Sequence, residues 1–144
     1  MSSLSFPDVN VWFALLYANH QHRETALRWW ETTPSDVIGM CRLSQMGLLR
    51  LMTTSAVMAG KPLTMLQAWD AYHRLFQDSR LAFFAEPPTL DEKFESLTQI
   101  RLSSPKVWAD AFLLAFARCH GGELITFDQA LLNQPNCQVL QHIP

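Results

Sequence analysis

Three aspartates stand at positions where an apolar chain would place few charges, namely Asp8, Asp110 and Asp128. Asp8 follows the apolar run LSFP and Asp128 follows LITF, so each ends a segment with the composition of a buried strand. Asp110 is the one residue that is not apolar between Val107 and Ala117. An ionised carboxylate in such a segment is costly to bury unless it is paired, hydrogen-bonded or bound to a metal.

Carboxylates gathered in one pocket repel one another unless some are protonated or a cation lies among them. Mg²⁺ and Mn²⁺ prefer oxygen ligands, whereas zinc favours Cys and His clusters, and no such cluster of suitable spacing occurs here. A divalent ion can bind a phosphate oxygen, lower the pKa of a bound water and stabilise a leaving oxygen. The three acids therefore predict phosphodiester hydrolysis, with Asp8, Asp110 and Asp128 as metal ligands and catalytic residues.

Each acid also has an ordinary structural interpretation. Asp8 could cap the helix that follows it, and Asp128 could occupy a turn or cap the short helix QALL. Asp110 could pair with Arg101 or Arg42. Taken together, however, two acids at strand ends and one in an apolar helix favour a common site.

The elements that would position these acids alternate between strands and helices. We expect strands within residues 4–8, 34–40, 80–88, 123–128 and 137–141. We expect helices within residues 9–20, 22–33, 42–53, 65–77, 89–100, 105–120 and 129–134. Gly47 is a weak position in one of these helices, because glycine disfavours the helical state.

Capping residues predict several helix boundaries. Thr64 is a plausible N-cap, and Thr89 with Glu92 has the spacing of a capping box. Pro105 fits the first helical position, which would put Asp110 about two turns into its helix. In the helix after Thr64, a stripe at 3.6-residue spacing consists of Leu66, Trp69, Tyr72 and Phe76.

The length of 144 residues, with 49% hydrophobic and 17% charged residues, predicts one domain over residues 1–144. Apolar strands that alternate with helices predict an α/β fold, with a mostly parallel sheet flanked by helices on both sides. Ligand sites in such sheets lie beyond the carboxyl ends of the strands, where Asp8 and Asp128 are expected. A net charge of −2 gives no broad basic surface, so a nucleic acid would have to be bound by a local site.

Cysteine usage and the N-terminal residues bear on the compartment. The three cysteines are an odd number without C-x-x-C spacing, which favours reduced thiols in a cytoplasmic protein. The first residues lack the basic and apolar regions of a secretory signal. The longest apolar run is too short for a bilayer of about 30 Å, so no membrane association is expected.

The sequence resembles the PIN-domain ribonucleases and, more narrowly, the VapC-type toxins of VapBC toxin–antitoxin systems. The resemblance is carried by FPDVNVWFALL, RLSQMGLLRLMT and WADAFLLAFARCHGGELITFDQAL, and by the order of the acids. In the family motif the conserved acids match Asp8, Asp110 and Asp128, and positions that commonly support them match Asn10 and Thr126.

This resemblance implies a single PIN-like domain with a sheet of about five parallel strands. It also implies an endoribonuclease toxin that hydrolyses RNA with Mg²⁺ or Mn²⁺ as cofactor. The implied partners are the RNA substrate, a cognate VapB-type antitoxin and, as a homodimer, a second copy of the chain.

Gln45 departs from the family pattern, because many PIN domains have a glutamate in the helix after the second strand. Glutamine offers a neutral carbonyl oxygen but removes one negative charge. We therefore expect a weaker or differently arranged metal site. The alternative function is a catalytically weak PIN domain that acts mainly as an antitoxin-binding partner and co-regulator of its operon.

Three further residues are candidates for binding RNA. Arg42 and Arg50 are spaced two turns apart on one helix and could reach phosphates, although solvated helix charges would look the same. Trp12 could stack on a base, although a tryptophan in an apolar chain also fits a core or partner interface. The five histidines show no ligand spacing and are expected to be structural or surface residues.

Overall fold

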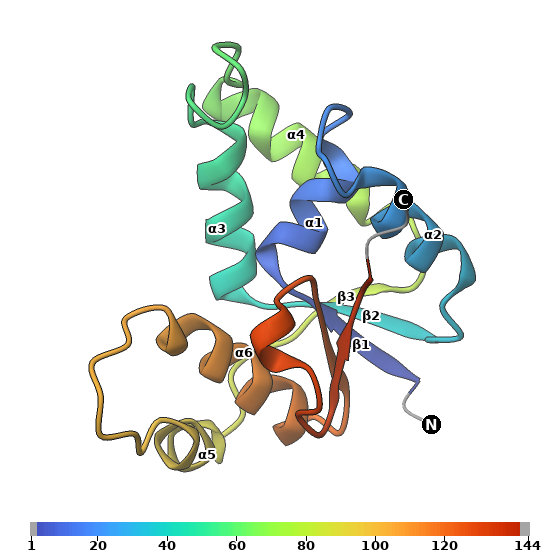
Figure 1. The fold of residues 1–144 in the computed structure, drawn as a ribbon. Helices are drawn as coiled ribbons and strands as arrows, with labels where there is room; N and C mark the ends of the chain where they lie inside the picture. Colours follow the sequence, from blue (N-terminus) through green and yellow to red (C-terminus); the bar gives the residue numbers. More distant parts are fainter. Residues whose placement is uncertain (1–2, 142–144) are drawn as a thin grey trace.

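The protein is described here by a computed structural model, which covers residues 3–141 and contains one parallel five-stranded sheet (Figure 1). The strand order is β3-β2-β1-β4-β5, and each neighbouring pair is parallel. The strands are β1 (Leu4–Pro7), β2 (Val37–Met40), β3 (Leu81–Phe83), β4 (Glu123–Thr126) and β5 (Cys137–Val139). The expected α/β fold with a parallel sheet is confirmed.

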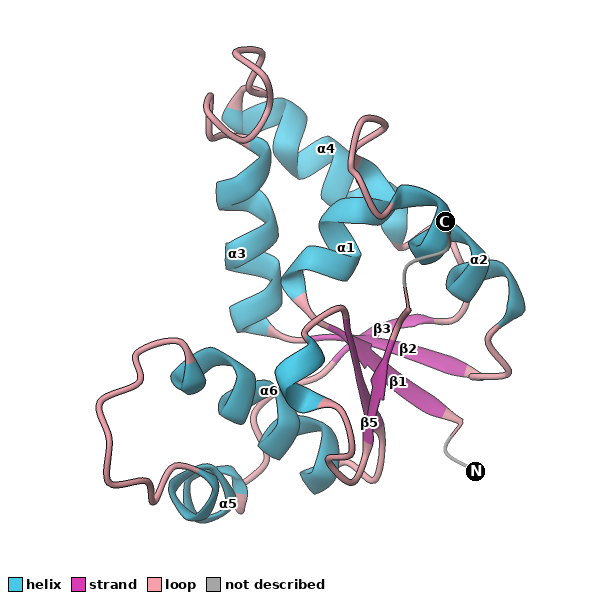
Figure 2. Cartoon of the chain, in the orientation of Figure 1, coloured by secondary structure: helices cyan, strands magenta, loops and turns pink. Residues whose placement is uncertain are grey.

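Helices cover both faces of the sheet (Figure 2). On one face lie α1 (Val9–Leu16), α2 (Arg23–Thr32), α3 (Arg42–Met52) and α4 (Met65–Leu75). On the other face lie α5 (Leu90–Leu97) and α6 (Val107–Cys119), and a short 3₁₀ helix, η1 (Gln129–Leu131), follows β4. Each face buries its own apolar cluster, so the sheet is covered on both sides as its apolar strands predict.

The register of the two middle strands brings two distant parts of the chain together. Phe6 pairs with Leu124 and Pro7 with Ile125, so β1 and β4 end side by side. The backbone N–H of Asp8 continues this ladder and donates to the carbonyl of Ile125 at 2.8 Å. The residues that follow β1 and β4 therefore meet at one edge of the sheet.

Helix α6 begins later than the sequence suggests. Residues 105–106 form a turn, the N–H of Val107 donates to the carbonyl of Ser104 at 3.0 Å, and the helix starts at Val107 instead of Pro105. Asp110 consequently lies in the first turn and not two turns in. The positive end of the helix dipole at this position favours a carboxylate.

Two predicted N-caps have different outcomes. Thr64 and Gln67 form a reciprocal capping box at the start of α4. Thr89 precedes α5 but caps nothing with its side chain, because its hydroxyl lies 3.6 Å from the sulfur of Cys119. The capping box predicted for Thr89 and Glu92 is therefore not formed.

Only part of the apolar stripe predicted for helix α4 faces the core. Leu66 is 74% exposed and Trp69 is 41% exposed, while the neighbouring alanines Ala68 and Ala71 are buried. The other two stripe residues agree with the prediction, since Tyr72 is buried in the core and Phe76 packs against it.

Two smaller expectations concern the cysteines and the membrane. All three cysteines are free thiols. Within residues 3–141, none of the helices is long and apolar enough to cross a membrane.

Candidate active site

Asp8 is the residue between β1 and α1, and it is only 9% exposed. One carboxylate oxygen accepts a hydrogen bond from the backbone N–H of Val11 at 3.0 Å, which caps α1. The other oxygen accepts a hydrogen bond from the hydroxyl of Thr126 at the end of β4. Asp8 therefore caps α1, as its structural interpretation predicts, and is also a buried acid; its role as a metal ligand stays a prediction.

Asp128 has a similar place after β4. Its carboxylate accepts a hydrogen bond from the N–H of Ala130 at 2.9 Å and so caps η1. Its own N–H donates to the hydroxyl of Thr126 at 3.1 Å. The carboxyl groups of Asp110 and Asp128 lie within hydrogen-bonding reach of each other. The structure therefore brings Asp8, Asp110 and Asp128 together from three elements.

Burial and mutual repulsion favour the neutral forms of two of these acids. Burial raises the pKa of Asp8, although hydrogen bonds from Thr126 and Val11 oppose the rise. Burial, followed by the hydrogen bond to Asp128 and the negative charges of Asp128 and Asp8, raises the pKa of Asp110 to about 7. No arginine or lysine neutralises Asp110, since the one ion pair among residues 3–141 joins Arg80 and Asp78. The predicted pairing of Asp110 with Arg101 or Arg42 is not formed.

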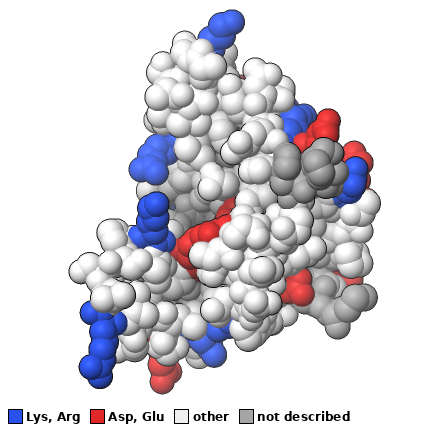
Figure 3. All heavy atoms as spheres, viewed as in Figure 1, with Lys and Arg blue, Asp and Glu red and all other residues white. Residues whose placement is uncertain are grey.

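The acids border an open cavity of about 390 Å³. Its lining residues are Asp8, Asn10, His20, Gln21, His22, Asp110, Phe127 and Asp128. Figure 3 shows acidic atoms in a recess of the surface, with basic atoms along one margin. This size falls within the range of about 300–1,000 Å³ that is usual for small-molecule pockets.

The donor chemistry of this pocket fits a hard divalent cation. Its acids supply carboxylate oxygens, and a cation among them would offset both the burial of Asp110 and its repulsion from Asp128 and Asp8, which raise its pKa. Within residues 3–141, however, no three His, Cys, Asp or Glu side chains are grouped closely enough to form a ready-made metal cluster. A bound ion would therefore complete its coordination with water, as Mg²⁺ commonly does.

Of the supporting residues predicted from the sequence, two lie at this site. Thr126 is fully buried and joins Asp8 to Asp128 through its hydroxyl. Asn10 is exposed and lines the pocket beside the acids.

Gln45 lies elsewhere. It is buried in α3 at 7% exposure, but it is not among the lining residues of the acidic pocket. Its carbonyl oxygen accepts a hydrogen bond from Arg42, and its side chain also bonds the hydroxyl of Tyr72 on α4. The amide therefore satisfies its polar groups at the α3–α4 contact, and a supporting role of Gln45 in a metal site stays a prediction.

The three residues predicted to bind RNA lie in different surroundings. Trp12 is fully buried in the core and packs edge-on against Trp30, so it cannot stack on a base. Arg42 lies over the ring of Phe83 at 4.7 Å and lines neither neighbouring cavity. Arg50 is exposed and lines a cavity of about 570 Å³ that shares Asn10 with the acidic pocket.

Four further lining residues of the acidic pocket were not predicted from the sequence as site residues. His20, Gln21 and His22 come from the turn between α1 and α2, and Phe127 precedes Asp128. The histidines lack metal-ligand spacing, but two signals were usable: the segment HQH between two predicted helices, and the aromatic Phe127 directly before the strand-end acid Asp128.

Comparison with known proteins places these observations in a family. The family model described as PIN domain matches residues 5–135. Ribonuclease VapC41 of Mycobacterium tuberculosis is 38% identical over 128 residues, which cover 85% of this chain and 88% of that protein. Ribonuclease VapC44 of the same organism is 32% identical over 125 residues, covering 86% of this chain and 85% of the relative.

Two solved structures share the fold at low sequence identity. The crystal structure of M. tuberculosis VapC20, described as a Sarcin-Ricin loop cleaving toxin, is 21% identical with a TM-score of 0.68. It covers 95% of this chain and 99% of its own. A toxin–antitoxin complex from Klebsiella pneumoniae is 18% identical with a TM-score of 0.65, covering 96% and 99%. The chain therefore belongs to the PIN-domain family and, within it, to the VapC group.

Proposed function

We propose that this chain is an endoribonuclease toxin of a type II toxin–antitoxin system that depends on Mg²⁺ or Mn²⁺. The observation that carries the proposal is the pocket in which Asp8, Asp110 and Asp128 meet without a neutralising side chain. Membership of the VapC group and the ribonuclease names of its relatives support RNA as the substrate. We expect the chain to act as one domain over residues 1–144, in the cytoplasm.

In this mechanism Asp8, Asp110 and Asp128 would hold the cation. When bound, the ion supplies positive charge at the phosphate and acidifies a water. Thr126 holds the carboxylate of Asp8 in place, and the α1 cap fixes its second oxygen. The carboxyl group of Asp110, whose pKa is raised to about 7, would release its proton when the cation binds.

Substrate binding would extend from the acids towards α3. Asn10 borders both cavities, and Arg50 offers a cation to a neighbouring phosphate. The positive charge of Arg50 beside these cavities suits a chain whose net charge is −2, because it attracts RNA locally and not over the whole surface.

The test is RNA cleavage by the purified protein, together with growth after expression. Wild type should cut bacterial RNA with Mg²⁺ or Mn²⁺ and arrest growth, and EDTA should abolish cleavage. Asp8→Asn and Asp110→Asn should each lower the rate by about 100-fold or more, the scale of losing a group that stabilises a transition-state charge. Asp91→Asn, on the exposed face of α5, is the matched control and should act like wild type. Undiminished toxicity of the Asp8/Asp110 double variant would end the proposal.

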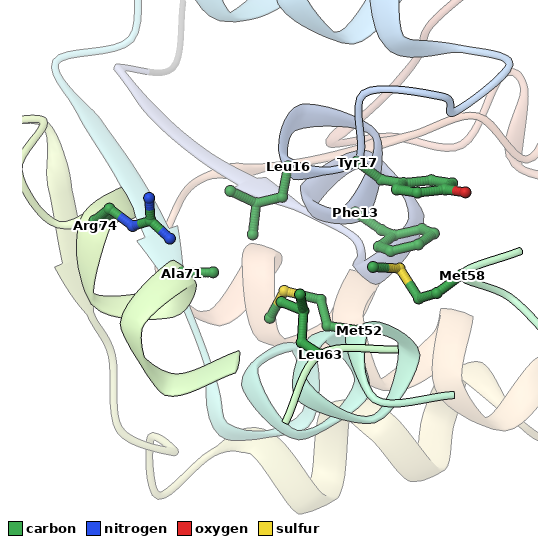
Figure 4. Close-up of a pocket in the computed structure, with 8 residues that line it drawn as sticks. All are labelled: Phe13, Leu16, Tyr17, Met52, Met58, Leu63, Ala71 and Arg74. Atoms are coloured by element: carbon green, nitrogen blue, oxygen red, sulfur yellow. The ribbon is translucent and has the colours of Figure 1, made fainter. Parts of the chain in front are cut away.

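We also propose an antitoxin partner, bound on the side of the molecule formed by α1 and α4. Two adjoining cavities of about 340 Å³ and about 290 Å³ share Leu16 and Arg74. In Figure 4 the side chains of Leu16 and Phe13 face those of Met52 and Leu63 across the first cavity, with Arg74 at one side. Such a groove suits an apolar peptide segment that carries an acidic residue opposite Arg74.

This partner is tested by co-purification with the antitoxin encoded beside the toxin gene. Arg74→Glu should weaken the complex by at least about tenfold, because it turns an attractive charge into a repulsive one. Arg28→Glu on the exposed face of α2 serves as the charge-matched control. Equal affinities of both variants would remove this groove from the proposal.

Finally, we propose a homodimer through the apolar projection formed by residues 98–108. Ile100, Leu102 and Trp108 are all more than half exposed there. Exposed apolar side chains gathered in one place are typical of an interface. Sedimentation equilibrium should give a dimer for wild type and a monomer for Leu102→Asp; a monomeric wild type would contradict this assignment.

A further inference from the structure

Part of the wall of the acidic pocket consists of residues to which the proposed function gives no role. It is built by His20, Gln21 and His22 from the turn after α1, together with Phe127. Backbone hydrogen bonds order this turn, since the N–H of His20 donates to Tyr17 and that of Arg23 donates to His20, each at 3.1 Å.

Aromatic packing holds the ring of His20 in place. The ring lies roughly parallel to Phe127, with centroids 6.3 Å apart, and edge-on to Phe13 at 5.6 Å. His22 packs on the same Phe127 ring with centroids 4.7 Å apart. Because Phe127 directly precedes Asp128, this wall is anchored to the same strand end as the acids.

A hydrogen bond selects the tautomer of His20. The backbone N–H of His22 donates to Nδ1 of His20 at 3.0 Å, so Nδ1 must carry a lone pair. In the neutral ring the proton then lies on Nε2. No hydrogen-bond partner for Nε2 is found among residues 3–141. Burial and the neighbouring His22 lower the pKa of His20, which agrees with a neutral ring.

We propose that the Nε2–H of His20 donates a hydrogen bond to a phosphate oxygen of the RNA strand lying in this pocket, which makes His20 a substrate-positioning residue. The inference rests on the proposed function for the identity of the ligand. A neutral donor suits a wall opposite carboxylates, because it attracts a phosphate oxygen without forming an ion pair with the acids. The pocket of about 390 Å³ has room for the phosphate and its nucleoside.

Two substitutions separate hydrogen bonding from packing. His20→Phe keeps an aromatic ring against Phe127 but has no donor, and His20→Gln restores an amide N–H near the position of Nε2. His73→Phe is the control, because His73 is exposed on α4 and packs on Trp69 away from the pocket.

Cleavage of bacterial total RNA with Mn²⁺ measures the effect. We expect His20→Phe to lower kcat/KM by about 10- to 100-fold, mainly through KM, as for a lost hydrogen bond to a charged group. His20→Gln should recover most of this loss, and His73→Phe should cleave RNA like wild type. Because His20→Phe also removes the Nδ1 acceptor of the His22 N–H, the melting temperature of each variant is measured to show that it folds. Wild-type cleavage by His20→Phe, or a His20→Gln variant no better than His20→Phe, would overturn the proposal.

A second measurement does not depend on cleavage. In ¹⁵N-histidine spectra of the metal-free protein near pH 7.5, roughly one unit above the usual pKa of histidine, His20 should be the Nε2–H tautomer. Addition of uridine 3′-monophosphate should shift its Nε2 signal but not that of His73. An Nδ1–H tautomer would overturn the proposal. If wild type cleaves no RNA while this tautomer and shift are observed, the proposed function fails and the His20 site stands as a nucleotide-binding site.

Discussion

The hydroxyl of Thr126 donates a hydrogen bond to Asp8 and accepts one from the backbone N–H of Asp128. One buried side chain at the end of β4 thereby joins the acids that follow two neighbouring strands. The resemblance to PIN domains implied a supporting role for Thr126, and these contacts give that role a physical basis.

Replacing Thr126 by valine removes the hydroxyl while keeping the shape of the side chain. Asp8 would lose a donor in a buried site, so we expect the free energy of unfolding at pH 7 to fall by about 1–3 kcal/mol. Urea denaturation measures this change. Thr126→Ser retains the hydroxyl and should lose less stability; equal stability of Thr126→Val and wild type would contradict the inferred importance of this bond.

The carboxyl group of Asp110 should make the metal-free protein less stable as the pH rises. Its pKa is about 7 in the folded chain, above the ordinary carboxyl value, so the folded state binds the proton more tightly. This contribution is fully present below about pH 4 and is lost as the pH rises through 7. Because the side chain is half-buried, we expect a loss of about 1–2 kcal/mol, measured by denaturation in EDTA.

Asp110→Asn is the control for this pH dependence. It should flatten the decline in stability between pH 4 and pH 8 and should be more stable than metal-free wild type at pH 8. Mn²⁺ should restore the stability of wild type, by about 2.7 kcal/mol at 100 times its Kd, and affect the variant less. Parallel pH profiles for the two proteins would show that Asp110 is not the group responsible.

Gly47→Ala tests the close packing of α3 on α1. Alanine improves helix propensity by up to about 1 kcal/mol. Its Cβ, however, would lie 2.8 Å from a methyl carbon of Val9. Overpacking costs about 1–3 kcal/mol, so we expect a net loss of stability. Val9→Ala removes that methyl carbon. Thermal denaturation should therefore show a smaller loss of stability from Gly47→Ala in the Val9→Ala variant than in wild type.

Gln45→Glu should leave Mn²⁺ affinity unchanged. From the family pattern alone, a glutamate here would be expected to strengthen metal binding. Gln45 instead contacts Arg42 and Tyr72, outside the acidic pocket. Calorimetric titration of wild type and Gln45→Glu with Mn²⁺ compares the two views. A tighter Kd for the variant would mean that this side chain can turn into the pocket.

The strands and two of the acids were predictable because their signals are local. Short apolar runs that end in aspartate indicate buried strands whose carboxyl ends share one edge, and Asp8 and Asp128 lie there. The sequence also predicted that Asp110 lies in a helix near these acids, but that helix begins at Val107, two residues later than Pro105 suggested. Proline marked the approach to the helix, while hydrogen bonding at Ser104 determined where it began.

Side-chain direction was less predictable, because it depends on contacts between elements. Gln45 and Trp12 have the right spacing for the site but face other partners. His20 was overlooked for the opposite reason, since neither its spacing nor its neighbours in the chain show that Phe127 lies beside it. Gly47 was interpreted only as a weak helical position, because its close neighbour Val9 belongs to another helix.

The central place of β1 in the sheet also determines when the site can form during translation. The hydrogen bond between Thr126 and Asp8 spans 118 residues of chain, so the first acid to be translated waits for its partners until β4 has been made. The site therefore cannot assemble on a growing chain before β4, which pairs directly with β1, has been made.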